Sequence, residues 1–128
     1  MNWKQYLNWD ENQINDLRYL ACSYLHQGKY DIAISFFEAL TIVDPNNIYD
    51  LQMLGAIYLE IQKNREALTY LNKALAINST DPSTLLNKAT VLFALGRKKE
   101  GKEILAVLQD SKNKKIMNAA NAMLLSLT

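Results

Sequence analysis

The chain has 128 residues, of which 49% are hydrophobic and 21% are charged, and its formal net charge is +1. This composition is typical of one globular domain with a buried core, and so small a net charge gives no electrostatic reason to expect a nucleic-acid or membrane partner. Four Gly and two Pro are too few for the turns of an all-β fold, so the composition favours helices.

The chain begins with a short aromatic segment, residues 2–10, which carries Trp3, Tyr6, Leu7 and Trp9. It lacks the basic start and apolar core of a signal peptide, and no later apolar run reaches the roughly 18 residues of a membrane span. We expect this segment either to cover the first helices or to contact a partner, with at least one Trp buried.

A helical hairpin is predicted next. Apolar residues recur at i, i+3, i+4 and i+7, which is one face of a helix, and Gly28 is suited to end it. A second helix is expected to begin near Tyr30. The residues predicted to face the inside of the hairpin are Leu17, Leu20, Ala21 and Tyr24 in the first helix, and Ala33, Phe37 and Leu40 in the second.

The same pattern returns at a constant spacing, in rows that begin at Ile14, Ile48 and Pro82. This spacing, called one repeat length below, is about 34 residues. We therefore expect repeats at 14–47, 48–81 and 82–115, with turns at Asp44-Pro45 and Asp81-Pro82. A helical bundle with chance periodicity is the alternative, but three rows in one register disfavour it. The matching columns include Ala21/Gly55/Ala89, Tyr24/Tyr58/Leu92, Ala33/Ala67/Gly101 and Phe37/Leu71/Leu105.

A last amphipathic helix is predicted over residues 114–127. Stacked hairpins expose an apolar flank at each end and need a cap there, so we expect this helix to cover the third hairpin. Residues 1–128 would then form a single domain. The apolar stripe of the capping helix consists of Ile116, Ala119, Ala120, Met123 and Leu127.

These columns resemble the tetratricopeptide repeat, whose first helix carries a large, a small and an aromatic residue and whose second carries small and aromatic ones. The first row is near the ideal pattern, whereas the third departs from it at Lys88, where a large apolar residue is expected. The resemblance implies an all-α superhelix of three helical hairpins, with a short N-terminal segment and a C-terminal capping helix.

Few residues could support catalysis or metal binding. Cys22 and His26 lie four residues apart on one predicted helix, so a Cys–His nucleophile pair or a metal site has to be considered. No further soft ligand is available to complete a zinc site, and no group is evident that would orient a catalytic pair. We expect no catalytic residue, no metal and no cofactor. A single cysteine also fits a reducing cytoplasm.

A partner is expected on the concave side, which the first helix of each hairpin lines. Leu25, Leu59 and Phe93 hold equivalent places and predict a row of large apolar side chains, unless these simply pack between repeats. The predicted groove residues, called the groove row below, are Asn15, Arg18, Cys22, Leu25, Tyr49, Gln52, Ala56, Leu59, Leu86, Thr90 and Phe93.

The composition of the groove row separates two kinds of partner. Repeat proteins that hold the acidic C-terminus of heat-shock chaperones clamp its carboxylates with an asparagine column and basic residues. Here that column reads Cys22, Ala56 and Thr90, and two of the basic places are Gln52 and Leu86. The clamp is missing, so the groove suits a hydrophobic or amphipathic segment.

Two stretches resemble chaperones of bacterial type III secretion. Residues 28–45 with 54–56 are similar to the chaperones of translocator proteins. The total length and the tail 105–127 are similar to the needle-subunit chaperones, and the short segment before the first repeat also favours that branch. The resemblance implies a cytoplasmic protein that keeps a needle subunit from polymerising too early, together with a second small co-chaperone in a heterodimer or heterotrimer. A translocator chaperone and a general adaptor in a larger assembly are the alternatives.

Overall fold

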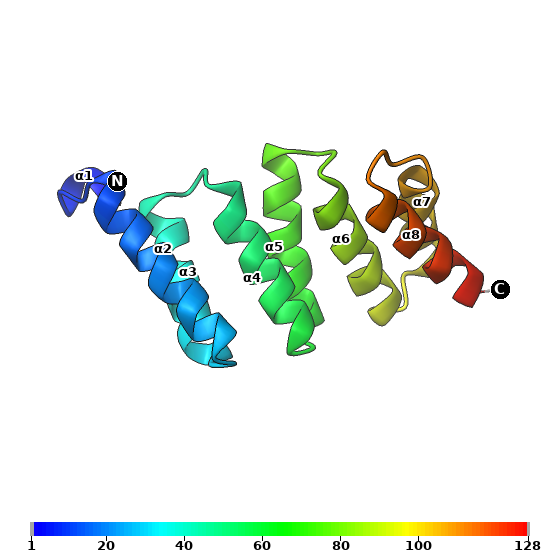
Figure 1. Cartoon of the computed structure of the whole chain (residues 1–128), viewed down its shortest axis with the longest axis horizontal. Helices are drawn as coiled ribbons and strands as arrows, with labels where there is room; N and C mark the ends of the chain where they lie inside the picture. The colour runs from blue at the N-terminus through cyan, green and yellow to red at the C-terminus, as the bar shows by residue number, and fades with distance from the viewer. Residues whose placement is uncertain (1, 128) are drawn as a thin grey trace.

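The computed structural model describes residues 2–127, and this part of the chain contains eight helices and no strand. They stack in chain order along one elongated body with the termini at opposite ends (Figure 1). The helices are α1 (Trp3–Tyr6), α2 (Glu11–His26), α3 (Tyr30–Val43), α4 (Ile48–Glu60), α5 (Asn64–Ile77), α6 (Pro82–Ala94), α7 (Lys98–Leu108) and α8 (Lys114–Ser126).

Three helical hairpins form the stack. Helix α2 pairs with α3, α4 with α5 and α6 with α7, and the first helices of the second and third hairpins also pack against the second helix of the preceding hairpin. The predicted all-α superhelix is confirmed. Helix α2 begins at Glu11, three residues before the first row of the repeat, because Asp10 and Gln13 form a capping box there.

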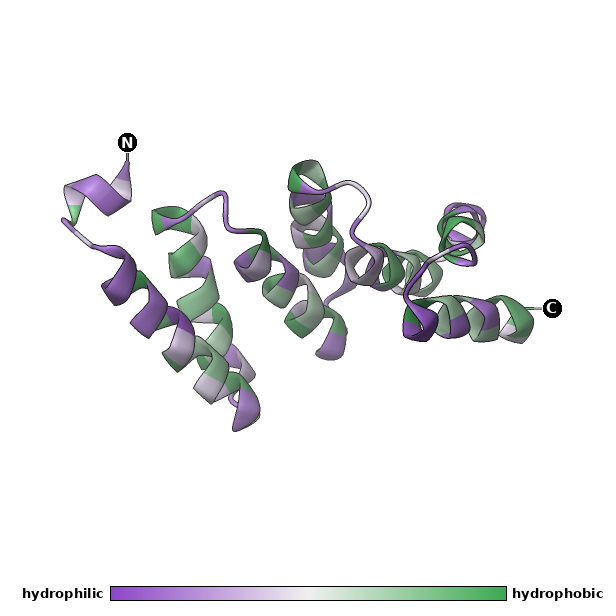
Figure 2. Ribbon diagram, turned by 45° about the horizontal axis from the view of Figure 1, so that its top comes forward, coloured by the Kyte–Doolittle hydropathy of each residue, from purple (hydrophilic) through white to green (hydrophobic). Residues whose placement is uncertain are grey.

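The core follows the columns of the repeat. Figure 2 shows α3, which lies between α2 and α4, as largely hydrophobic, whereas the start of α2 is hydrophilic. The small columns allow close approach: a Cβ atom on Gly55 would lie 2.5 Å from Cδ2 of Leu71, so α5 packs directly on the backbone of α4. The largest fully buried apolar residues are Ile14, Phe37, Leu40, Leu54, Leu71, Leu92 and Leu105.

The two ends differ in how firmly they are covered. At the N-terminal end Trp9 packs against the first core cluster, whereas Trp3 is exposed and makes an edge contact with Tyr6. At the other end Ile116 and Ala120 of α8 are buried against α6 and α7, which agrees with a capping role. Within residues 2–127 we find no helix with the length and apolar character of a membrane span.

Each hairpin turn contains one residue in the left-handed region of backbone conformation. Gly28 has φ of 73° and Gly96 has φ of 79°, but the equivalent place in the second hairpin is occupied by Gln62 at 63°. A residue with a Cβ atom is strained there by about 1–2 kcal/mol, which exceeds the roughly 0.4–1 kcal/mol that Gly costs through the entropy of the unfolded chain.

We therefore expect Gln62→Gly to raise the free energy of unfolding by about 0.5–1 kcal/mol, as measured by urea denaturation. The control is Lys63→Gly, because Lys63 has φ of −91° and its substitution should only destabilise. Equal losses of stability in the two variants would show that the turn at Gln62 is not strained.

Candidate partner-binding groove

The groove row lies on the first helices of the three hairpins. Asn15 and Tyr49 are exposed, and the other nine members are half-buried. Side chains from neighbouring first helices meet along this row: Arg18 and Cys22 of α2 reach residues of α4, and Gln52 of α4 reaches Thr84 of α6. The contacts at each junction between hairpins decide what the row can offer to a partner.

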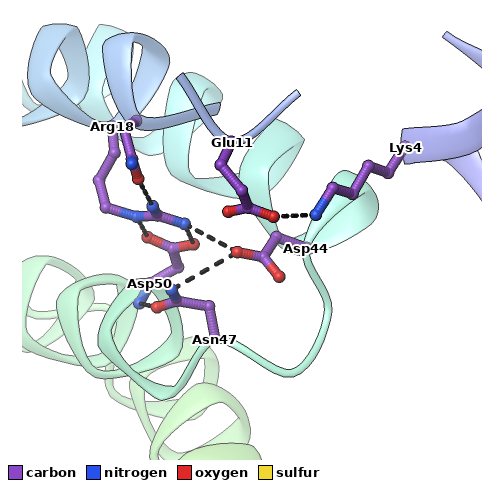
Figure 3. Close-up of polar contacts among 7 residues, drawn as sticks. Lys4, Glu11, Arg18, Asp44, Asn47 and Asp50 are labelled. Atoms are coloured by element: carbon purple, nitrogen blue, oxygen red, sulfur yellow. Dashed lines mark hydrogen bonds and ion pairs between the residues drawn. The ribbon is translucent and has the colours of Figure 1, made fainter. Parts of the chain in front are cut away.

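Arg18 is bound at the first junction, between α2 and α4 (Figure 3). Its Nε donates to Oδ1 of Asp50 at 2.7 Å, and its Nη2 donates to Oδ2 of Asp50 at 2.7 Å and to Asp44 at 3.1 Å. Its Nη1 donates to Asn15 at 2.9 Å. Asp50 is fully buried, and the hydrogen bond with it raises the pKa of Arg18. The guanidinium therefore joins two repeats and is not directed at a partner.

A second ion pair extends this network toward the N-terminus. Lys4 of α1 pairs with Glu11 at the start of α2, close to Asp44 (Figure 3). Glu11 is well exposed and Lys4 is partly exposed, so the pair orients α1 against the first hairpin without contributing much stability.

A neutral version of the same link occupies the second junction. Gln52, one repeat length after Arg18, donates from Nε2 to Asp81 at 3.0 Å and to Thr84 at 2.9 Å. Thr84 is buried and stands one repeat length after Asp50. At the third junction Leu86 replaces Gln52 and packs in the apolar cluster that contains Ile116 and Ala120 of α8. The junctions thus change from ionic to neutral polar to apolar along the stack.

The sequence prediction did not identify Asp50 or Thr84. The sequence does contain a signal that could have identified them. A polar residue on the first helix of one hairpin has a polar partner on the first helix of the next hairpin, as in Arg18 with Asp50 and Gln52 with Thr84. Each pair is one repeat length from the other.

Cys22 and His26 point to different partners. The Cys22 Sγ lies 3.3 Å from the Tyr49 hydroxyl, and His26 Nδ1 lies 2.7 Å from the backbone oxygen of Cys22. The contact with Cys22 together with burial raises the pKa of Tyr49 to about 12. The thiol and imidazole do not face one another, and within residues 2–127 no three His, Cys, Asp or Glu side chains gather as metal ligands would. The geometry gives no support to the Cys–His alternative.

The predicted row of large apolar side chains is divided among the hairpins. Leu25 packs with the first core cluster, Leu59 with the cluster around Leu71, and Phe93 with the cluster around α8. A Cβ atom on Gly101 would lie 2.9 Å from the ring of Phe93, so this ring covers α7. The clusters of Leu25 and Leu59 also contain residues of the next hairpin, so these two side chains pack between repeats, which was the alternative to a row open to a partner. Ala56 and Thr90 are smaller members of the row.

Comparison with known proteins gives a family and a fold. The model of the tetratricopeptide-type family described as anaphase-promoting complex, cyclosome, subunit 3, matches residues 26–108, and the chain belongs to this family. A search of the curated proteins gave no match.

Solved structures extend the likeness to nearly the whole chain. The type III secretion translocator chaperone SycD of Yersinia enterocolitica superposes with a TM-score of 0.83 over 96% of both chains, at 20% identity. The structure of PcrH in complex with the chaperone-binding region of PopD superposes with a TM-score of 0.80 over 91% of this chain and 92% of that one, at 21% identity. A structure of PcrH from Pseudomonas aeruginosa is also similar. The first repeat domain of Spaghetti (RPAP3), bound to an HSP90 peptide, superposes with a TM-score of 0.78 over 92% of this chain and 95% of that one, at 25% identity. The predicted likeness to type III secretion chaperones is thus confirmed for the fold.

Proposed function

We propose that this member of the subunit 3 family is a cytoplasmic type III secretion chaperone whose groove row holds a hydrophobic or amphipathic segment of a secreted translocator subunit. The observation that carries the proposal is the match to SycD and PcrH over more than nine-tenths of each chain. Structures of SycD with a peptide of the translocator YopD, and of PcrH with a region of PopD, show such partners on this fold.

The chemistry of the groove row supports an apolar occupant. Arg18 is the only cation of the row, and two carboxylates already neutralise it. The Gln52 amide is likewise held by Asp81 and Thr84. An acidic peptide, like the SRMEEVD segment bound by Spaghetti, would find no available cation on this row. Ala56 and Thr90 leave room for apolar side chains of a partner instead.

The choice of a translocator rests on the solved neighbours that hold translocator segments. The expectation of a needle-subunit client rested on the total length, the tail and the short segment before the first repeat, but the chain covers 96% of the SycD chain in the solved structure. Length therefore does not separate the two branches, and the translocator-bound neighbours favour that class. A needle subunit held together with a small co-chaperone is the second candidate, supported by the resemblance of the tail.

Co-expression tests the proposal and separates these clients. The chain is produced with a translocator subunit or with a needle subunit from the same genome, and each pair is analysed by size-exclusion chromatography with light scattering. We expect a soluble 1:1 complex with the translocator, which alone should be insoluble. A translocator that is soluble and monomeric without the chain would contradict a chaperone role, and a complex with the needle subunit alone would select the second candidate.

A substitution at the centre of the groove row locates the site. Ala56→Arg places a long charged side chain between Leu25 and Phe93 of the neighbouring repeats, and we expect roughly tenfold or more weaker binding of the translocator by calorimetry. The matched control is Ala39→Arg on the exposed side of α3, which should bind as the wild type does. Circular dichroism should be unchanged in both. Equal binding by the two variants would place the partner on another surface.

A further inference from the structure

An open cavity of about 1060 Å³ lies in the third repeat, between α6, α7 and the loops that precede α6 and follow α7. Its apolar lining includes Leu85, Leu92, Ile104 and Val107, and Lys88 also borders it. No member of the groove row takes part in the lining. The cavity is therefore a second concave surface, separate from the proposed client site.

Aromatic pairs fill the equivalent place in the first two repeats. Tyr24 of α2 stacks on Phe36 of α3, with ring centroids 5.6 Å apart and an interplanar angle of 16°. In the second repeat Tyr58 stacks on Tyr70 at 5.7 Å and 9°. Both pairs join the first helix of a hairpin to the second, so the stack is a recurrent element of this fold.

The third repeat lacks this pair. The residues one repeat length after Tyr58 and Tyr70 are Leu92 and Ile104, and neither can replace the volume of a phenol ring. Lys88 in turn stands where the second repeat buries Leu54 completely. Two aromatic rings and one leucine of the second repeat are thus replaced by a smaller leucine, an isoleucine and a lysine.

The cavity has a smaller counterpart one repeat earlier. That pocket has a volume of about 340 Å³ and is lined in part by Leu51 and Lys73, which are equivalent to Leu85 and Val107. The threefold larger volume in the third repeat accompanies the loss of the aromatic pair and of the buried leucine.

The rim of the cavity carries a defined pattern of charge. Val107 is 67% exposed and lies on α7 between Glu103, four residues before it, and Asp110, three residues after it. Glu103 lies one helical turn before Val107 on α7, whereas Asp110 lies in the turn that follows the end of the helix, and both residues border the cavity. Neither carboxylate has a side-chain partner in residues 2–127, whereas the nearby Glu100 is bound by Arg97.

Two cations also border the cavity. Lys88 interacts with Glu100, and Lys112 lies in the loop after α7. Glu103 and Asp110 are therefore the two rim carboxylates that have no side-chain partner within residues 2–127, and Val107 lies between them in the sequence.

We propose that this cavity is a docking site for a protein segment that presents an aromatic side chain between two basic residues. The aromatic ring would pack against Leu85, Ile104 and Val107 of the lining, and the basic groups would pair with Glu103 and Asp110. The proposal goes beyond the client groove, since it assigns a second binding surface to the chain.

A short peptide of this chemistry tests the site. Acetyl-Lys-Ala-Trp-Ala-Lys-amide places its Trp and both Lys side chains on one side of an extended backbone. We expect saturable shifts of the methyl NMR signals of Leu85, Ile104 and Val107 when it is titrated into the full chain. The peptide with Ala for Trp, and the one with Glu for both Lys, should cause at least tenfold weaker effects. Equal effects of all three peptides would overturn the proposal.

Variants of α7 link the shifts to the cavity. Ile104→Tyr restores the second-repeat residue at this place and should abolish binding, whereas Ala106→Tyr adds the same ring to an exposed position of α7 and should not. Because Ile104→Tyr could unfold the repeat, Val107→Lys is a second test: it imitates Lys73 at an exposed site and should weaken binding at least tenfold. Retained binding in Val107→Lys would overturn the proposal.

Two further results distinguish the alternatives. Ala56→Arg should bind the peptide as the wild type does, so that failure of the groove and failure of the cavity are separable. A second copy of the chain could also offer an aromatic residue, since Trp3 is exposed. Sedimentation velocity would detect such self-association. If Trp3→Ala and Val107→Lys both removed it, the occupant of the cavity would be a second copy of the chain, and the proposal would be overturned.

Discussion

Replacing Arg18 with Met is expected to lower the free energy of unfolding by about 3–5 kcal/mol. The substitution keeps most of the length of the side chain but leaves the Asp50 carboxylate fully buried without its cation. The cost of burying an uncompensated charge exceeds the value of the ion pair itself. Urea denaturation followed by circular dichroism measures the loss, and proteolysis should detect opening between the first and second hairpins.

A double variant shows whether the buried charge is the cause. Arg18→Met with Asp50→Leu removes both charges, and its stability should recover most of the loss seen in Arg18→Met alone. The control is Arg97→Met, since Arg97 and its partner Glu100 are about half exposed, and an ion pair screened by solvent contributes little to stability. A double variant no more stable than Arg18→Met would mean that packing, and not the charge on Asp50, dominates.

Leu54→Ala should destabilise the chain by about 2–5 kcal/mol, because it opens a cavity in a fully buried part of the core. Leu54 packs in one cluster with Phe37 and Leu40 of the preceding hairpin, so the loss would also weaken the junction between repeats. Thermal and urea unfolding both report it, and the two methods should agree if the stack unfolds in one transition.

The matched control lies in the same column of the repeat. Leu20 precedes Leu54 by one repeat length but is 47% exposed, because no hairpin stands before the first one. We expect Leu20→Ala to change stability by no more than about 0.5 kcal/mol. A comparable loss in both variants would show that the N-terminal segment covers Leu20 in solution.

The fold could be predicted to a large extent from sequence. A constant repeat length, kept by small and large apolar columns, is sufficient to indicate stacked hairpins. Gly28 marked the end of the first helix of its hairpin correctly, and it has the left-handed backbone that favours glycine, as Gly96 in the same column does. Gln62 shows where such inference stops, because the same turn forms there without a glycine.

The groove was predictable only as a row of positions. Repeat position indicated which residues lie on the first helices, yet it could not indicate their contacts. Arg18 and Gln52 form hydrogen bonds within the junctions between hairpins, and the ring of Phe93 covers Gly101. These residues keep the predicted place on the helix, but intramolecular contacts take up much of their capacity to bind.

Sequence by itself therefore determined the class of fold, the number of hairpins and most of the residues that face the core, because periodicity along a helix is a local property. Leu20 is the exception: it was predicted to face the inside of the first hairpin but is 47% exposed. Tertiary structure alone decided the ion pair of Arg18 and Asp50, the three different environments of Leu20, Leu54 and Lys88, and the cavity of the third repeat. The physical reason is that these features depend on the rotation and spacing of neighbouring hairpins. That arrangement is determined by contacts between side chains nearly one repeat length apart in the sequence.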